Sequence, residues 1–254
     1  MKVTAIKTKK VIVGDDLYKI LDNYLPKKIN EGSIVAITSK ILSICEGSVV
    51  KVNEVDKDEL VKKEADYYLP KEENKYNIFL TIKNGIMVAT AGIDESNGNG
   101  YYVLWPRNPQ ESANQIRAYL IKRYGLKHIG VMITDSRTTP LLRGVSGMYI
   151  AHSGFLALKN YINKPDLFGR KLLVTRANFA EGIAGAVVTM MGEGSEMTPL
   201  VVIDDVPFIK FQERNPTKSE VSKLRIPLKE DIFAGMLTNV KWIKGKASID
   251  KANE

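Results

Sequence analysis

Two acidic turns, each directly after an apolar run, carry the residues of this chain that are best suited to chemistry. In the first turn Asp94 follows the run 86–89, and in the second Asp135 follows the run 129–133. Short apolar and β-branched runs that end in glycine or polar residues are typical of buried strands. Carboxylates at the carboxyl ends of such strands lie where open α/β sheets usually bind ligands. The sequence therefore predicts that both acids face a binding site.

A third acid, Glu193, stands in the glycine-rich turn Met191-Gly192-Glu193-Gly194-Ser195-Glu196. Carboxylates that converge next to glycine backbone suit a hard divalent cation that holds phosphate. Taken singly, each acidic turn has a plainer interpretation, because Asp, Ser and Asn often stabilise turns through their own side chains. The three turns together favour a nucleotide-using active site.

Six cations stand beside these turns or at segment ends, where they could bind phosphate or carboxylate oxygens. They are Lys40, Arg107, Arg137, Arg143, Arg170 and Arg176. The alternative for most of them is a solvated surface charge. Arg143 differs because it stands between Leu141-Leu142 and Gly144-Val145, and a charge inside apolar sequence usually has a partner. We expect Arg143 to face a phosphate or a glutamate carboxylate in the site.

Motif searches exclude several other kinds of site. The sequence has no Walker A loop and no G-x-G-x-x-G that opens a helix, so a nucleotide site must be built from other elements. The two histidines, His128 and His152, lack zinc-ligand spacing, and no G-x-S-x-G elbow marks a serine hydrolase. Cys45 is the only cysteine, so no intrachain disulfide can form, and we expect it to be a small buried hydrophobic residue.

Composition and charge indicate a globular protein with anionic partners. Of the 254 residues, 44% are hydrophobic and 26% are charged, and the net charge of +8 gives a pI near 9.3. This balance favours nucleotides or acidic small molecules, whereas dispersed basic residues without a nucleic-acid motif argue against nucleic acid. No apolar run approaches the roughly 18 residues that span a bilayer, and residues 1–6 resemble an edge strand more than a signal peptide. We expect a cytoplasmic protein that does not bind membranes.

Elements in the amino-terminal part position the first of these residues. The pair Asp15-Asp16 offers an aspartate as N-cap for an amphipathic helix over residues 17–25. The run 33–38 predicts a buried strand that delivers Ser39 and Lys40 at its end.

Further along, the pattern predicts a charged helix over 56–69 and a hairpin over 77–91 that turns at Lys83-Asn84-Gly85. A strong helix start at Asn108-Pro109 leads to a helix that ends at Gly125. An Ala- and Gly-rich helix is expected over 175–191, which places Glu193 just beyond its carboxyl end.

The remaining segments complete a mixed α/β (α+β) fold. We expect a strand over 200–203, a short helix over 231–237, and a mobile polar loop over 213–220. Strands and helices alternate without a strict βαβ rhythm, which argues against a doubly wound sheet.

With these residues in hand, the chain resembles the gamma-glutamyl ligases that elongate the deazaflavin coenzyme F-420, and their bacterial relatives assigned to folate metabolism. The matching segments follow the family's order between residues 14 and 205. They are Gly14-Asp15-Asp16-Leu17, Thr38-Ser39-Lys40-Ile41 with Glu46-Gly47, Ala91-Gly92-Ile93-Asp94 with Ser96-Asn97, Ile133-Thr134-Asp135-Ser136, Arg143-Gly144-Val145 with Gly147, Asp166-Leu167 with Gly169-Arg170, and Met191-Gly192-Glu193-Gly194.

The resemblance implies roles for individual residues. Metal ligands would be Asp94, Asp135, Ser136 and Glu193. Nucleotide contacts would come from Ser39, Lys40, Asn97, Met191, Gly192, Glu193, Gly194 and Ser195. Lys40 and Arg143 are the candidate catalytic residues.

The resemblance also implies an activity and an assembly. It implies a single gamma-glutamyl ligase-like unit over 1–254, with 206–254 as a carboxyl-terminal extension, in an intertwined homodimer. The activity would be amide ligation of L-glutamate to an acidic acceptor such as coenzyme F-420-0 or a folate-like molecule, through an acyl phosphate. The cofactors would be GTP or ATP and Mg²⁺ or Mn²⁺, with K⁺ as an optional further ion.

The chain departs from the family pattern in three places: Thr8-Lys9-Lys10-Val11, Ile44-Cys45, and Leu104-Trp105-Pro106-Arg107, where the family has Leu-Leu-Pro. These departures favour the folate-type branch. Two other classes of function stay open at this point. One is a nucleotide-binding regulator without ligase activity, which the three intact acids disfavour. The other is a basic RNA-binding protein.

Overall fold

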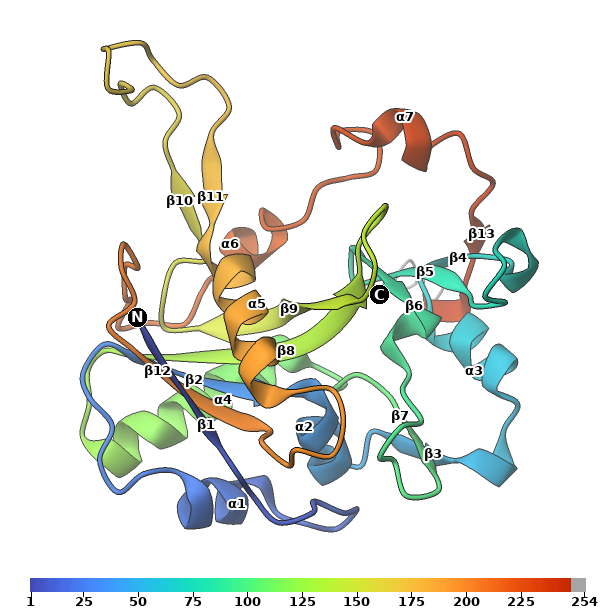
Figure 1. Cartoon of the computed structure of the whole chain (residues 1–254), viewed down its shortest axis with the longest axis horizontal. Coiled ribbons are helices and arrows are strands. Elements are labelled where there is room, and N and C mark those ends of the chain that lie inside the picture. Colours follow the sequence, from blue (N-terminus) through green and yellow to red (C-terminus); the bar gives the residue numbers. More distant parts are fainter. Residues whose placement is uncertain (248–254) are drawn as a thin grey trace.

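A five-stranded mixed sheet forms the centre of the computed structural model, which describes residues 1–247 (Figure 1). Its strands, in spatial order, are β1 (Lys2–Ile6), β12 (Leu200–Asp204), β2 (Ser33–Thr38), β8 (Ile129–Thr138) and β9 (Val145–Ser153). Only β2 and β8 run parallel, and Thr38 at the end of β2 pairs with Thr134. β8 continues to Thr138, paired with β9, so the segment that follows β2 starts beside residues 135–138 of β8.

Helices cover both faces of this sheet (Figure 1). On one face lies α5 (Phe179–Met191), and on the other lie α1 (Leu17–Tyr24), α2 (Ser39–Glu46) and α4 (Pro109–Tyr124). Alternate residues of β2 serve the two layers: Ile34 packs on the α5 side and Val35 on the opposite side. This period of two lets one strand contribute to two hydrophobic cores.

A second lobe packs beside the sheet and has its own small core. It contains the sheet β13-β4-β5-β6, the pair β3-β7 and the helix α3. Their bounds are β3 Val49–Lys51, α3 Lys57–Glu64, β4 Tyr67–Leu69, β5 Leu80–Lys83, β6 Ile86–Ala89, β7 Tyr101–Val103 and β13 Ile243–Lys244, with the short 3-10 turns η1 Val52–Glu54, η2 Lys71–Glu73 and η3 Thr90–Gly92.

Three apolar projections extend away from the two lobes (Figure 1). The hairpin of β10 (Leu158–Asn160) and β11 (Arg176–Asn178) carries a loop on which Phe168 is 95% exposed. The tip between β8 and β9 exposes Leu141 fully. The carboxyl-terminal segment contains α6 (Lys218–Ser222) and α7 (Ala234–Leu237), where Met236 is 65% exposed. Side chains of this kind are normally covered in solution.

Most of the predicted elements are confirmed, and with them the mixed α/β class. Helix α1 begins after Asp16, whose carboxylate accepts from the backbone of Tyr18, and β2 spans the predicted 33–38. Helix α4 has its cap at Asn108 and ends at Gly125, as predicted. The hairpin β5-β6 turns at Asn84-Gly85. Among the described residues no helix is long and apolar enough to cross a membrane.

Three sequence predictions are wrong in detail. The helix expected over 56–69 ends at Glu64, and Tyr67–Leu69 form β4, because these residues pair with β5 in the second sheet. The helix expected from residue 175 begins at Phe179, since Arg176–Asn178 pair with β10. The polar segment 213–220 was expected to be a loop, yet Thr217 and Glu220 form a capping box that starts α6.

Two further expectations meet the structure in part. The short helix expected over 231–237 is confined to Ala234–Leu237. Residues 248–254 of the expected extension lie outside the described part of the chain.

Candidate functional site

The turn of Asp94, the glycine-rich turn of Glu193 and residues 135–136 of β8 meet in one open cavity of about 660 Å³ at the carboxyl end of β2. Its lining includes every predicted metal and nucleotide residue: Ser39, Lys40, Asp94, Asn97, Asp135, Ser136, Met191, Gly192, Glu193, Gly194 and Ser195. Residues 8–12 of the amino-terminal loop, which were not predicted as site residues, form another wall of the same cavity. That loop is tied to the glycine-rich side by the bond from the Thr8 backbone N–H to the Met197 carbonyl, 2.9 Å long.

Asp94 lies in the first turn as a half-buried carboxylate with a cation beside it. Lys40 Nζ is 2.7 Å from Asp94 Oδ2. The Ser96 backbone N–H and hydroxyl donate to the same carboxylate at 2.8 and 3.0 Å. Burial raises the pKa of Asp94, but Lys40 and Ser96 outweigh it and hold that pKa below its ordinary value. Asp94 is therefore ionised at neutral pH.

Asp135 lies within β8, so the turn expected at residues 134–137 is wrong: these residues stay in the strand because they pair with β9. Its carboxyl group is more deeply buried than that of Asp94. The Ser136 backbone N–H donates to its Oδ1 at 2.8 Å, and the Trp105 indole N–H donates to its Oδ2 at 2.5 Å. Burial raises the pKa of Asp135 to about 6, against the effect of these donors and of the Ser39 hydroxyl; the nearby charge of Asp94 adds to the rise. Two acids that repel each other in this way gain from a bound cation.

The glycine-rich turn begins where α5 ends, and its shape depends on Gly192. At φ 75° and ψ 170° this residue reverses the chain, and a Cβ added there would lie 2.5 Å from Glu196 Cδ. Hydrogen bonds join this turn to the turn of Asp94 and to β8. Asn97 Nδ2 donates to the Gly194 carbonyl at 3.0 Å, and Ser136 Oγ donates to Glu193 Oε2 at 3.3 Å.

The donor set of this cavity fits a hard divalent cation. Carboxylates of Asp94, Asp135 and Glu193 with the hydroxyl of Ser136 are oxygen ligands of the kind that Mg²⁺ and Mn²⁺ take. Within residues 1–247, however, no three acidic, histidine or cysteine side chains already stand in metal-binding geometry. Lys40 occupies the space beside Asp94, so a cation at that carboxylate requires Lys40 to move.

Arg143 is the one predicted site residue that lies outside this cavity. It is exposed at the tip of the β8-β9 hairpin, and no ion pair or hydrogen bond joins it to any other described residue. The expectation that its apolar neighbours imply a partner is wrong within one chain, because Leu141 and Leu142 are themselves 105% and 71% exposed. Arg143 therefore does not line the cavity of its own chain.

Three other residues discussed in the sequence analysis lie outside the lining of this cavity: Arg137, His152 and Cys45. Arg137 pairs with Glu181 at 2.5 Å, outside the cavity. His152 is buried, and burial lowers its pKa to about 4, so it is neutral at pH 7. Cys45 is only half-buried, which corrects the expectation of a fully buried residue, yet burial raises its pKa to about 12 and makes it unreactive.

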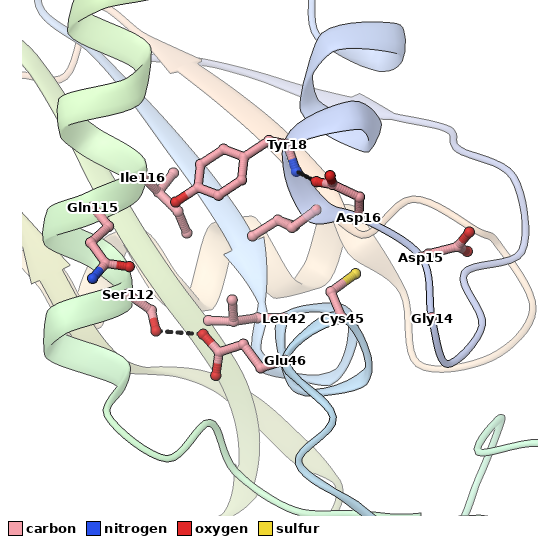
Figure 2. A pocket seen from close by; sticks show the side chains of 11 residues that line it. Gly14, Asp15, Asp16, Tyr18, Leu42, Cys45, Glu46, Ser112, Gln115 and Ile116 are labelled. Atoms are coloured by element: carbon pink, nitrogen blue, oxygen red, sulfur yellow. Dashed lines mark hydrogen bonds between the residues drawn. The ribbon is translucent and has the colours of Figure 1, made fainter.

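Cys45 belongs to a second, smaller cavity of about 390 Å³ between α1, α2 and α4 (Figure 2). The floor of this cavity is apolar, with Leu42 and Ile116, and its rim carries Glu46, which accepts from Ser112 Oγ at 2.5 Å. Asp15 and Asp16 add two more acids at the rim. None of the predicted nucleotide or metal residues lines this smaller cavity.

Comparison with known proteins shows the family of this chain. A family model described as F420-0:Gamma-glutamyl ligase matches residues 5–205. The Coenzyme F420:L-glutamate ligase of Methanocaldococcus jannaschii is 32% identical over 227 residues, which cover 81% of this chain and 86% of the relative. The protein of the same name from Archaeoglobus fulgidus is 32% identical over 205 residues, 75% of this chain and 81% of the relative. The one from Methanopyrus kandleri is 30% identical over 210 residues, 76% and 82% of the two chains.

These matches cover most of the chain and all residues of the larger cavity. The chain therefore belongs to the F420-0:gamma-glutamyl ligase family. Its class as a ligase that forms a carbon–nitrogen bond, expected from the sequence, is confirmed.

Proposed function

We propose that this member of the F420-0:gamma-glutamyl ligase family joins L-glutamate to a carboxylate acceptor in a reaction that depends on a nucleoside triphosphate and a divalent metal. The observation that carries the proposal is the meeting of Asp94, Asp135 and Glu193 in one cavity of about 660 Å³. A cavity of this size is suited to a nucleotide.

The chemistry follows from the need to activate a carboxylate before an amine can attack it. Transfer of the terminal phosphoryl group of GTP or ATP to the acceptor carboxylate gives an acyl phosphate and a nucleoside diphosphate. The amine of glutamate then attacks the acyl carbon, forms the amide and releases phosphate. Mg²⁺ or Mn²⁺, when bound, supplies neutralisation of the phosphate charge. K⁺ would be an optional further ion.

The residues of the cavity divide this work. The metal would be held by Asp94, Asp135, Ser136 and Glu193, because their hard oxygen ligands converge on the same cavity. Lys40 would release Asp94 and bind phosphate oxygens. Residues 191–195 would wrap the nucleotide with glycine backbone, and Asn97 and Ser39 would add polar contacts from the facing turns.

Two chemistries fit the acceptor. The relatives that match this chain are named for coenzyme F420, which favours a deazaflavin acceptor. The departures at residues 8–11, 44–45 and 104–107 favour a folate-like acceptor. Segments 8–11 and Leu104 line the same cavity, so they are placed to contact whichever acceptor binds. The net charge of +8 suits either of these acids and the nucleotide.

A homodimer completes the proposal and gives Arg143 its role. The exposed apolar side chains of the two hairpins and the α7 segment would be covered by a second copy of the chain. Arg143 lies on one of these projections, so we assign it to the site of the partner subunit, where it would bind a phosphate or a glutamate carboxylate.

Isothermal titration of the purified protein with GTP, ATP and a short RNA, each with Mg²⁺ and with chelator, tests this proposal. The expected result is binding of GTP or ATP that weakens at least tenfold in chelator, and no binding of RNA. Equal nucleotide affinity with and without metal would contradict metal dependence. RNA binding in place of nucleotide would contradict the ligase proposal and support the RNA-binding alternative.

A further inference from the structure

The indole of Trp105 connects the core of the protein to the candidate site through one hydrogen bond. Trp105 is 3% exposed and packs with Ile86 and Val88 in the central core. Its Nε1–H donates to Asp135 Oδ2 at 2.5 Å. A buried indole N–H without a partner would be energetically unfavourable, so this contact constrains both side chains.

Neighbours on two sides fix the indole in place. Gly92 lies so close that an added Cβ would be 2.2 Å from Trp105 Nε1, and its φ of +71° also favours glycine. Lys83 Nζ lies over the ring at 5.9 Å from the centroid, and the same ammonium is bound to Glu64 at 2.7 Å. Both contacts come from the second lobe, so the position of the indole depends on how that lobe packs against the sheet.

The bond to Trp105 decides how the Asp135 carboxylate faces the cavity. The Ser136 backbone N–H already holds Oδ1 at 2.8 Å, and the indole holds Oδ2 from the core side. With both oxygens held, rotation of the carboxylate is blocked, and its remaining lone pairs are available to the cavity that Asp135 lines. A leucine at position 105 would fill the core but donate no bond.

We propose that Trp105 is a positioning residue whose indole N–H holds the Asp135 carboxylate in the orientation that binds the divalent cation. The proposal rests on the metal dependence proposed above. It assigns a chemical function to a residue at which this chain differs from the family pattern, and it makes Gly92 a requirement of that arrangement because only glycine leaves room for the indole.

The first test compares two Trp→Phe variants for Mn²⁺ binding in the absence of nucleotide and acceptor. The chain has two tryptophans, and Trp242 also donates its N–H, to the Leu237 carbonyl at 2.7 Å, far from the cavity lining. Trp105→Phe keeps an aromatic ring but removes the donor, and the matched Trp242→Phe removes a donor elsewhere. We expect Trp105→Phe to weaken Mn²⁺ binding about ten- to hundredfold and Trp242→Phe to leave it unchanged.

The outcomes separate this inference from the proposed function. Wild-type protein that binds no Mn²⁺ would contradict the metal dependence and, with it, this inference. Wild-type and Trp105→Phe proteins with equal Mn²⁺ affinity would overturn only the role of Trp105, which would then be a core residue alone.

A second measurement needs no substitution of Trp105, whose loss from the core could unfold the protein. In the Trp242→Phe variant, the single remaining indole N–H resonance in a ¹⁵N-labelled sample belongs to Trp105. We expect this resonance to be protected from exchange with solvent and to shift when Mg²⁺ is added. In the Asp135→Ala variant of the same background, it should lose both properties. A Trp105 resonance that ignores saturating Mg²⁺ would overturn the inference.

Discussion

Lys40 neutralises Asp94: its Nζ lies 2.7 Å from Asp94 Oδ2 and 3.1 Å from the Ser96 carbonyl. Both side chains are partly exposed, so the pair adds little to stability. Its importance is positional, because the lysine stands where a metal ion would approach Asp94. In the proposed reaction, a metal at Asp94 would displace Lys40 from the carboxylate toward the nucleotide phosphates.

The first prediction concerns Lys40→Gln. Loss of charge-assisted contacts worth about 1.5 to 3 kcal/mol should weaken nucleotide binding about ten- to hundredfold. Binding of Mn²⁺ alone should stay equal or become tighter, because a competitor for Asp94 is gone. Titration calorimetry with each ligand measures both effects. Lys57→Gln is the matched control, since Lys57 pairs with Glu95 outside the cavity and its loss should change neither affinity. Parallel losses of metal and nucleotide binding would contradict this account.

The second prediction is that Asp94→Asn abolishes ligation while the protein stays folded. The substitution keeps the shape of the turn but removes a charge that Lys40 balances now and that the metal would balance later. Steady-state assays at saturating magnesium, together with circular dichroism, check it. Near-normal turnover would remove Asp94 from the metal site.

The third prediction uses the pH dependence of Asp135→Asn. The folded pKa of Asp135 is about 6, above the ordinary 3.8. As pH rises from about 4 to 6 the unfolded chain ionises first, which lowers the stability of the folded metal-free protein, and above pH 6 the whole cost is present. A shift of this size is worth on the order of 3 kcal/mol. Asp135→Asn should therefore raise the melting temperature by several degrees at pH 7.5 and not at pH 4, while activity is lost.

Thermal scans without metal at both pH values decide this prediction. A variant that is less stable than wild type at pH 7.5 would show that burial of the ionised Asp135 carboxylate does not destabilise the folded protein. In wild-type protein, Mn²⁺ affinity should fall as pH drops below about 6, because a metal binds the ionised carboxylate.

The fourth prediction contrasts Glu193→Gln with Glu196→Gln. Glu193 touches Ser136 Oγ at 3.3 Å, whereas Glu196 accepts from the Gly194 N–H at 2.8 Å and shapes the turn. Glu193→Gln should weaken nucleotide binding in Mg²⁺ much more than in chelator. Any loss in Glu196→Gln should be the same in both conditions. Equal losses for Glu193→Gln would give that residue a structural role.

Local patterns were enough to predict much of this molecule. Neighbours in sequence decide three features that the structure confirms. They are the aspartate cap of α1, found at Asp16, the strand that delivers Ser39, and the end of α5 at Gly192. The position of Asp94 and Asp135 after apolar runs predicted that both face one site, but the turn expected at Asp135 is wrong, because β8 continues to Thr138 by pairing with β9.

Other features depend on contacts that sequence spacing does not reveal. Tyr67–Leu69 follow a helical pattern of charges but become a strand because β5 pairs with them. The partnership of Trp105 with Asp135 joins residues that come from different lobes of the chain. The expectation that Arg143 has a partner within the chain is wrong, because exposed apolar neighbours look the same in sequence as buried ones.

The fifth prediction tests Arg143 in the proposed homodimer. Arg143→Lys should lower catalytic efficiency about tenfold to a hundredfold without changing the melting temperature, because the side chain is exposed and joins no ion pair in the described structure. If it acts in the partner's site, inactive Arg143→Ala and Asp94→Asn proteins should restore activity when mixed and allowed to exchange subunits. About a quarter of wild-type activity is expected, because half the dimers are mixed and each mixed dimer has one intact site. No recovery in proven mixed dimers would contradict the assignment.

The most direct test of the central claim is mass analysis of the reaction product. The purified protein is incubated with coenzyme F-420-0 or a folate-like acceptor, L-glutamate, GTP or ATP, and Mg²⁺ or Mn²⁺, with Asp94→Asn as the control. We predict an acceptor heavier by one or more glutamyl residues, with one nucleoside diphosphate and one phosphate released per addition, and none of these products with the control. An acceptor mass that stays unchanged under every combination, from protein that binds nucleotide and metal, would contradict the account.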